Sequence, residues 1–351
     1  MTTTDEELNI EELLDEEAES AAGELFEHWR IEVDPGQTPV RVDKFLFEHR
    51  PNISRNRIQK AAQIGYVQAD GKPVKCNYKV KGGEVITLML DHPKRIWEVT
   101  PEDIPLDIVY EDPHLLVVNK AAGMVVHPGC GNYSGTLVNA LAWHLKEEPS
   151  FDVNDPNVGI CHRIDKDTSG LLVVAKTAET KTDLCKQFYD HSTKRTYLAL
   201  VWGNFSEDTG TVEGNIARNP KDRMQMAVFP PDSEVGKPAV THYEVQERFD
   251  HVTLLRCRLE TGRTHQIRAH MKHIGHVLFN DERYGGHEIL WGERTSSYKA
   301  FISNCFKVCP RQALHAETLG FTHPVTKEEM FFTAALPADM QALLEKWRKR
   351  V

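Results

Sequence analysis

The sequence lacks the features of several protein classes. No apolar run in the 351 residues approaches the ~18 residues that a membrane-spanning helix needs. The acidic N-terminus resembles neither a secretory signal nor an organellar transit peptide. The seven cysteines are scattered, and only Cys305 and Cys309 lie close together. This pattern predicts reduced thiols in a cytoplasmic protein rather than a disulfide framework.

Motifs for nucleotide cofactors and for metals are also absent. The sequence contains neither a phosphate-binding GxxxxGK[ST] loop nor a dinucleotide-binding GxGxxG turn. A metal-site hypothesis rests on four histidines that lie close together near a predicted helix, namely His265, His270, His273 and His276. However, the HExxH arrangement is missing, and no carboxylate of that helix has ligand spacing. We therefore expect no metal, and capping, stacking or phosphate binding are the favoured roles of these side chains.

Charge is distributed unevenly along the chain. Residues 1–24 contain ten Asp or Glu residues and no Lys or Arg. These ten account for the whole net charge of −10, so the rest of the chain is neutral. Residues 41–95 hold twelve Lys or Arg against five Asp or Glu. Acidic blocks usually stay solvated, which predicts a disordered tail over residues 1–30, whereas the basic block is a candidate surface for a polyanion.

The length of the chain and its prolines predict two domains joined by a linker. Residues 38–92 show the order helix, helix, strand, strand, with Ser54 as a helix N-cap. The linker spans 93–106, and the larger domain spans 107–351. In the larger domain, the pattern predicts strands at 115–118, 171–174, 197–201, 252–259 and 330–333, and helices at 136–146, 178–190, 264–274 and 338–349. This irregular alternation indicates an α+β fold with a mainly antiparallel mixed sheet.

Two polar segments of the larger domain adjoin predicted secondary structure. Residues 162–168 directly precede an apolar strand, and residues 261–271 join a strand to a helix. Rigid scaffolds present catalytic groups on such loops. From the residues alone, however, a solvated loop with ordinary ion pairs is the commoner explanation, so the function stays open at this point.

Five motifs, in sequence order, resemble the RluA family of pseudouridine synthases over residues 38–337. They are residues 119–128, 162–176, 195–201, 261–271 and 311–316. Two small departures are Ile164, where the family usually has Leu, and Ala121, where it usually has Pro. Residues 41–75 also resemble an S4 RNA-binding domain, a small α/β fold. The combination resembles the RluD-like branch, whose members modify large-subunit ribosomal RNA.

The resemblance implies an isomerase that rearranges the bond between uracil and ribose and needs no cofactor. It implies that Asp165 is catalytic, either by attack on the sugar or by removal of a sugar proton, and both routes need an ionised carboxylate. Arg268 would pair with it, and a bidentate contact would orient the carboxylate. Tyr197 would stack on uracil and assist proton transfer. Leu314 would pack against the base.

RNA is the expected partner, with no membrane, and we expect the chain to act as a monomer. The target uridine must leave its stack to reach the carboxylate. The expected RNA contacts are basic or polar residues of the two loops, the basic block and a loop over 218–226, namely His162, Arg163, Arg263, His265, Arg55, Arg57, Lys60, Lys72, Lys75, Lys221 and Arg223.

Two alternatives remain beside the enzyme. The first is a non-catalytic S4-type RNA-binding or ribosome-assembly protein, and the presence of Asp165, Tyr197 and Arg268 argues against it. The second is a glycosidase, which would need a second acid such as Asp167, and the RNA-binding module argues against that.

Overall fold

The computed structural model describes residues 25–49, 55–90, 99–129, 132–149, 151, 159–222, 224–293 and 295–350, without the side chains of residues 56 and 57. The chain forms two compact units, Met1–Glu98 and Val99–Val351. The predicted acidic tail up to residue 24 and the predicted N-cap Ser54 lie outside the described residues.

The first unit is a four-stranded antiparallel sheet with two helices. In chain order its elements are β1 (Phe26–Glu32), β2 (Val40–Arg41), α2 (Val42–His49), α3 (Arg55–Gln63), β3 (Val67–Ala69), β4 (Lys72–Pro73), β5 (Lys79–Val80) and β6 (Val85–Leu90). The sheet order is β1-β6-β3-β4, and β2 pairs with β5. The predicted order of two helices followed by strands is confirmed.

The predicted extent of the tail is wrong at its C-terminal end. The tail was expected to reach residue 30, yet Phe26–Glu32 forms β1 and pairs antiparallel with β6. Trp29 is buried in the core of this unit together with Phe45 and Ile86. The apolar residues that follow the acidic run are therefore part of the first unit, because the edge of β6 offers them backbone partners.

The second unit is built on one ten-stranded sheet. In chain order its elements are β7 (Ile108–Glu111), β8 (Leu115–Lys120), α4 (Leu137–His144), β9 (Ser169–Ala175), α5 (Ala178–Tyr189), β10 (Lys194–Trp202), β11 (Thr209–Arg218), β12 (Met226–Phe229), β13 (Lys237–Arg248), β14 (Val252–Leu259), α6 (Gln266–His273), α7 (Ser296–Val308), β15 (Leu314–Thr322), β16 (Glu329–Thr333) and α8 (Ala338–Arg348). The strand order is β12-β11-β13-β14-β10-β15-β9-β8-β7, and β16 pairs with β15. The fold is α+β and mainly antiparallel, as predicted. Within the described ranges, no helix is long and apolar enough to cross a lipid bilayer.

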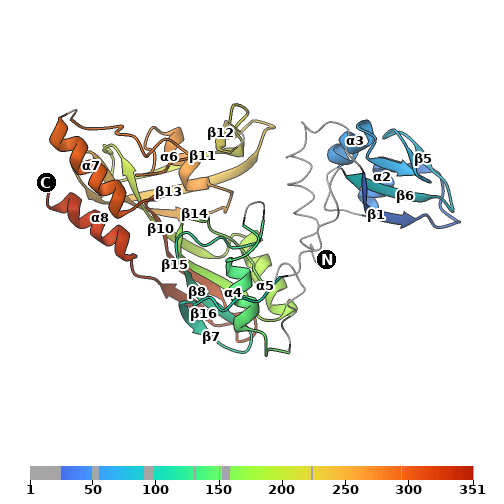
Figure 1. Ribbon diagram of the computed structural model, residues 1–351, viewed down its shortest axis with the longest axis horizontal. Helices are drawn as coiled ribbons and strands as arrows, with labels where there is room; N and C mark the ends of the chain where they lie inside the picture. Colours follow the sequence, from blue (N-terminus) through green and yellow to red (C-terminus); the bar gives the residue numbers. More distant parts are fainter. Residues whose placement is uncertain are drawn as a thin grey trace. The chain divides into compact units, whose positions relative to one another are not determined.

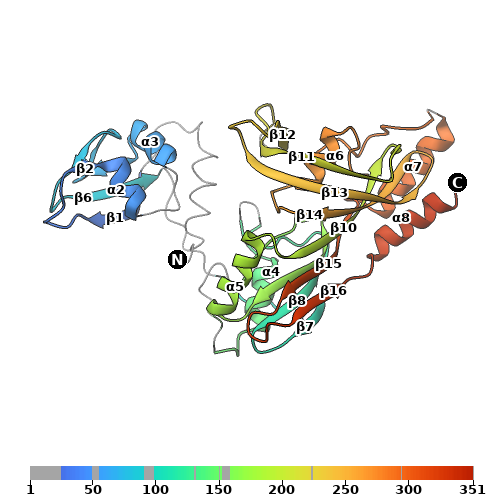
Figure 2. The same ribbon diagram turned by 180° about the vertical axis from the view of Figure 1, so that it is seen from behind.

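Helices cover both faces of this sheet. Alternate residues of β10 point to opposite faces. Tyr197 and Val201 pack in one core with α4 and α6, whereas Leu200 and Trp202 pack in another with α7 and α8. Figure 1 shows α7 and α8 side by side, and Figure 2 shows the same pair from behind. Burial on both faces explains why the central strands are almost continuously apolar.

The start of the second unit lies earlier than predicted. Residues 99–106 were expected to belong to a linker, but Val99 and Leu106 pack against the core that contains α4 and α6. The described part of the predicted linker therefore belongs to the second unit, because its apolar side chains find a place in that core.

One parallel strand pair lies at the centre of the sheet. β9 and β15 pair in parallel, with Ser169 opposite His315 and Gly170 opposite Ala316. Gly170 has a φ of +118°, and a Cβ there would overlap the carbonyl oxygen of Ala316. Only glycine fits this position. The pairing brings the end of the loop over 162–168 next to the residues 311–316 of the last motif.

Candidate active site

Asp165 lies in the loop that enters β9. The neighbouring Ile164 is buried in the core with α4 and α6, while the Asp165 side chain is 22% exposed. The amide of Thr168 donates a hydrogen bond to the Asp165 carbonyl at 3.1 Å, which closes a tight turn. The turn presents a carboxylate at the surface of the sheet while its flanks are fixed, as expected for a functional loop.

Two buried cations hold the backbone that follows Asp165. The Lys120 ammonium donates to the carbonyls of Ala121, Met124 and Lys166 at 2.7, 2.7 and 2.9 Å. Burial lowers the pKa of Lys120 to about 7. The charges of Asp167 and Asp165 oppose this shift, and an ammonium group supplies the three donors that the three carbonyls accept. Lys120 therefore ties the end of β8 to the residue directly after Asp165.

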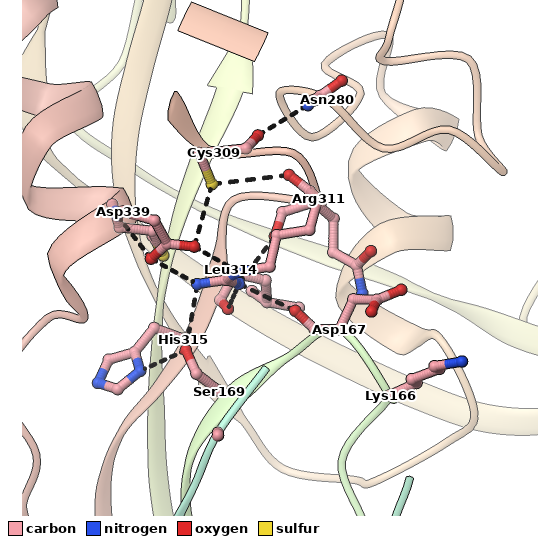
Figure 3. A network of polar contacts seen from close by, with 12 residues as sticks. Lys166, Asp167, Ser169, Asn280, Cys309, Arg311, Leu314, His315 and Asp339 are labelled. Atoms are coloured by element: carbon pink, nitrogen blue, oxygen red, sulfur yellow. Dashed lines mark hydrogen bonds and ion pairs between the residues drawn. The ribbon is translucent and has the colours of Figure 1, made fainter. Parts of the chain in front are cut away.

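Arg311 holds the next carbonyl of the same loop (Figure 3). Its Nη1 donates to the carbonyl of Asp167 at 2.9 Å. Its Nε and Nη2 donate to the two carboxylate oxygens of Asp339 at 2.7 and 3.0 Å, and Nη2 also lies 3.4 Å from Ser169 Oγ. A fork-to-fork contact of this kind fixes the plane of the guanidinium. The loop is thus connected to the last motif and, through Asp339, to α8.

Arg268 of α6 bridges two carboxylates. Its Nη1 donates to Asp165 Oδ2 at 2.8 Å. Its Nε and Nη2 donate to Asp281 at 2.7 and 2.9 Å. Burial opposes the charge of Arg268, but the contacts with Asp281 and Asp165 outweigh it and raise the pKa of Arg268. The expected bidentate contact with Asp165 is wrong in its geometry: the bidentate partner is Asp281, and Asp165 receives a single hydrogen bond.

Asp281 determines how Arg268 meets Asp165. Its side chain is fully buried and also accepts a hydrogen bond from the amide of Tyr284 at 3.2 Å. The Tyr284 ring lies under the guanidinium, with its centre 4.9 Å from Cζ of Arg268. With two nitrogens held by Asp281 and one face covered by the ring, Nη1 is left to contact Asp165.

Tyr197 lies on β10, on the face of the sheet that carries α6. Its side chain is buried in the same core as Ile164 and Leu314. Burial raises the pKa of Tyr197, and the charge of Asp165 adds to the increase. The phenol therefore keeps its proton at neutral pH. Leu314, at the start of β15, is 4% exposed and opposite Ala199 of β10. The structure thus brings Asp165, Arg268, Tyr197 and Leu314 to one face.

His265 also lies beside Asp165. It precedes α6 in the left-handed region, with a φ of +52°, which is uncommon for a residue other than glycine. Its Nε2 lies 3.9 Å from Asp165 Oδ2, and its Nδ1 lies 3.0 Å from the hydroxyl of Tyr284. Burial lowers the pKa of His265 to about 4, so the ring is neutral near pH 7.

His162 does not face the site, contrary to expectation. Its Nε2 accepts a hydrogen bond from the amide of Val173 at 3.1 Å. Its ring stacks on Phe188 of α5, with the ring centres 4.3 Å apart. Burial lowers the pKa of His162 to about 3. The expected contact with RNA is therefore wrong for this residue, because its ring packs beneath the loop and supports it.

We expect His162 to make the protein sensitive to acid. Between about pH 6.5 and pH 3 the unfolded chain binds a proton at this residue and the folded chain does not, so stability falls as the pH falls. His162→Gln keeps an acceptor for Val173 and removes the titration. The free energy of unfolding should then depend less on pH in this window, by up to about 1.4 kcal/mol per pH unit.

Urea unfolding at pH 7 and pH 4.5 measures this difference. His287→Gln is the matched control, because His287 is exposed. An unchanged pH dependence in His162→Gln would show that the ring binds protons equally well in the folded and unfolded chain.

The other expected RNA contacts of this unit differ in their exposure. Arg163 and Lys221 are exposed, which suits an RNA contact. Arg263 is half-buried and donates from Nε to the carbonyl of Pro238 at 3.1 Å, so part of its role is to hold β13. Arg223 lies outside the described residues.

The histidines of the metal-site hypothesis have separate partners. His270 contacts Thr241 Oγ1 at 2.9 Å, and His276 contacts the carbonyl of Trp202 at 2.8 Å and stacks on Phe205. Among the described residues, no group of three His, Cys, Asp or Glu side chains is arranged to hold a metal ion.

The basic residues of the first unit divide into two kinds. The buried Asp43 accepts hydrogen bonds from Arg41, Arg55 and Gln59. Burial opposes its ionisation, but these hydrogen bonds outweigh burial and lower the pKa of Asp43. Arg55 thus ties α3 to α2, in addition to its expected contact with RNA. Three further lysines, Lys60, Lys72 and Lys75, are exposed, and the side chain of Arg57 lies outside the described residues.

Four residues of the site had no role assigned from the sequence. Lys120 and Arg311 lie in recognised motifs, but their partners are backbone carbonyls, which no sequence pattern identifies. Asp281 and Tyr284 lie in the segment 280–286, outside all five motifs. The available signal was the clustering of charge, an aromatic residue and two glycines in a segment without apolar periodicity.

Comparison with known proteins identifies both units. The family model described as RNA pseudouridylate synthase matches residues 114–273, and the S4 domain model matches residues 40–86. An RNA pseudouridine synthase of Chlorobaculum parvum, itself uncharacterized, is 44% identical over 91% of this chain and 97% of its own. The chain belongs to the RNA pseudouridine synthase family and is an enzyme of the isomerase class. Its first unit is an S4 domain.

Named relatives and solved structures agree with this assignment. The protein of Xylella fastidiosa named ribosomal large subunit pseudouridine synthase D is 44% identical over 90% of this chain and 92% of its own. The structure of human RNA pseudouridylate synthase domain containing 1 aligns with a TM-score of 0.50 and 26% identity, covering 70% of this chain and 96% of that one. The fold of the second unit is therefore that of a pseudouridine synthase.

Proposed function

We propose that this enzyme converts specific uridines of large-subunit ribosomal RNA to pseudouridine, with Asp165 acting at the ribose. The observation that carries the proposal is the contact of Asp165 with Arg268, which is itself fixed by Asp281. It fixes the orientation of a partly exposed carboxylate on the same face as Tyr197. The names of relatives such as the Xylella fastidiosa protein support ribosomal RNA as the substrate.

The reaction exchanges one bond to ribose C1′ for another. The bond from C1′ to N1 of uracil breaks, the base turns, and a bond from C1′ to C5 forms while C5 loses a proton and N1 gains one. Substrate and product have the same composition, so the chemistry needs no cofactor. The ionised Asp165 carboxylate starts the reaction, either by attack at C1′ or by removal of a sugar proton. Tyr197 and Leu314 would contact the base, and Arg163 and Lys221 would contact the RNA around it.

The experiment that tests the substrate compares ribosomal RNA from cells with and without this protein. We expect one or more uridines of the large subunit to lose the modification in its absence and to regain it when the wild-type chain is supplied. Pseudouridine losses confined to transfer RNA would contradict the proposed substrate. We further propose that the enzyme acts as a monomer, which light scattering of the purified protein tests. We also propose that it acts in the cytoplasm, where this RNA is available, and cell fractionation tests that.

The exposed lysines of the S4 domain should supply affinity that depends on salt. Replacing Lys60, Lys72 and Lys75 with Ala should reduce the slope of log affinity against log salt by about 2, because each phosphate contact contributes about 0.7–0.9. Filter binding of a large-subunit RNA transcript at several salt concentrations measures the slope. The same substitutions at Lys299, Lys307 and Lys349, exposed on the other unit, are the control. Equal slopes for both triple variants would show that these lysines of the S4 domain make no phosphate contacts with the RNA.

A further inference from the structure

A short hydrogen-bond chain ends at His265. The amide of Met226, the first residue of β12, donates to the Tyr284 hydroxyl at 2.8 Å. The same hydroxyl lies 3.0 Å from Nδ1 of His265. Tyr284 is 2% exposed, so its hydroxyl depends on protein partners rather than on bulk water.

The available donors and acceptors determine which atom donates and which accepts in these two hydrogen bonds. The Tyr284 oxygen accepts from Met226, so its own hydrogen needs an acceptor, and Nδ1 of His265 is the one within reach. The opposite arrangement, with Nδ1–H donating to the same oxygen, would leave a buried hydroxyl hydrogen without a partner, which costs about 1–3 kcal/mol. Nδ1 is therefore the acceptor, and the neutral ring carries its proton on Nε2.

The Nε2–H of His265 faces the reactive carboxylate without being bound to it. Nε2 and Asp165 Oδ2 are 3.9 Å apart, beyond the length of a hydrogen bond. His265 has a left-handed backbone with a φ of +52°, and strained conformations of this kind cluster at functional sites. A neutral donor thus lies beside the group that acts on the sugar.

We propose that His265 donates a hydrogen bond from Nε2 to O2 of the target uracil and stabilises the ring as the glycosidic bond breaks. The inference rests on the proposed function, because it assumes that Asp165 acts at C1′. When the bond between N1 and C1′ breaks, its electron pair stays with the ring and is shared by N1 and O2. His265 keeps its proton and stabilises this charge, as donors placed at a developing anion do.

The position of O2 explains why this atom is the acceptor. O2 is attached to C2, which is bonded to N1, so it lies on the side of the ring that faces the sugar. O4 lies on the opposite side. A group next to the Asp165 carboxylate is therefore within reach of O2 when C1′ is at that carboxylate. Tyr284 does not touch the uracil in this arrangement and acts as a positioning residue that sets the tautomer.

The tautomer can be measured without substrate. In ¹⁵N-labelled protein, the two ring nitrogens of His265 have distinct shifts and couplings, and the signals are assigned by their loss in His265→Gln. We expect the Nε2–H form in the wild-type protein and a mixture of both forms in Tyr284→Phe, which lacks the hydroxyl. Finding Nδ1–H or the doubly protonated ring in the wild-type protein at pH 7 would overturn the proposal.

Two substitutions of His265 test whether a hydrogen-bond donor at the position of Nε2 is what the reaction needs. The amide nitrogen of Gln reaches the place of Nε2, whereas that of Asn reaches only the place of Nδ1. Asn also tolerates the left-handed backbone better than Gln, so backbone strain cannot explain a larger defect in Asn. In single-turnover assays on large-subunit RNA isolated from cells that lack this protein, we expect His265→Asn to lower the rate constant at saturating enzyme about 100-fold and His265→Gln to stay within about tenfold of wild type.

The outcomes distinguish the two levels of the proposal. If the wild-type protein forms no pseudouridine in this RNA, the proposed function fails, and the tautomer measurement still decides the direction of the hydrogen-bond chain. If the wild-type protein is active but the Asn and Gln variants have equal rates, the role of His265 as a donor fails. A change in the apparent dissociation constant with an unchanged rate constant at saturating enzyme would likewise contradict stabilisation of the breaking bond.

Discussion

Asp165→Asn should abolish pseudouridine formation, lowering the rate by roughly 10⁴-fold or more, the scale of loss when a central catalytic side chain is removed. Asn is nearly the same size but is neither a nucleophile nor a base. It can still accept a hydrogen bond from Arg268, so the fold and the affinity for RNA should be preserved. The measurement is the release of the C5 hydrogen from labelled RNA, together with RNA binding by the same variant.

Asp167→Asn separates the two carboxylates of this loop. The loop uses the backbone carbonyl of Asp167, which accepts from Arg311, and that contact does not need the side chain. The loss of rate should therefore be far smaller than for Asp165→Asn. Equal losses would indicate that both acids take part, as a glycosidase-like mechanism requires, and residual activity in Asp165→Asn would remove Asp165 from its proposed role.

Asp281→Asn should weaken both the fold and the reaction. It leaves the buried Arg268 with one charged partner instead of two, and breaking a buried ion pair costs about 3–5 kcal/mol. The guanidinium is then no longer fixed towards Asp165, and a misplacement of about 1 Å can cost roughly 100-fold in rate. Urea unfolding gives the stability, and single-turnover rates below the unfolding range give the activity.

A purely structural role for Asp281 would have a different signature. In that case the folded fraction of the variant would turn over at the wild-type rate, and only its stability would fall. Asp183→Asn is the matched control, because Asp183 pairs with the exposed Lys327 at 3.2 Å. Exposed ion pairs contribute about 0–1 kcal/mol, so this variant should resemble the wild-type protein in both measurements.

The strands could be predicted from the sequence where a continuous apolar run marks them. Val252–Leu259 forms β14 with the bounds expected from its apolar run. By contrast, β11 and β13 escaped prediction, because they alternate exposed and buried residues and contain Gly210, Gly214 and Pro238. Those residues normally indicate turns, and here the neighbouring strands of the sheet hold them extended.

The site was predictable in its residues but not in its contacts. The motifs indicated Asp165, Tyr197 and Arg268, and the structure brings these three to one face of the sheet. The partner of Arg268 could not be predicted, because Asp281 follows α6 in a segment without regular structure, and any of several carboxylates could have filled that place. His162 illustrates the converse: a polar residue of a recognised motif lies beneath the loop, and only packing reveals that.

The hydrogen bond from Arg311 to the loop affects the point during synthesis at which the catalytic loop can be fixed. The Asp167 carbonyl accepts a hydrogen bond from Arg311, which lies 144 positions further along the chain. Arg311 is in turn held by Asp339 of α8. Synthesis proceeds from the N-terminus, and units fold as they emerge. The S4 domain is therefore complete long before the loop that carries Asp165 can be fastened. The S4 domain can therefore fold first, and the loop that carries Asp165 is fixed only after Arg311 and Asp339 have been synthesised.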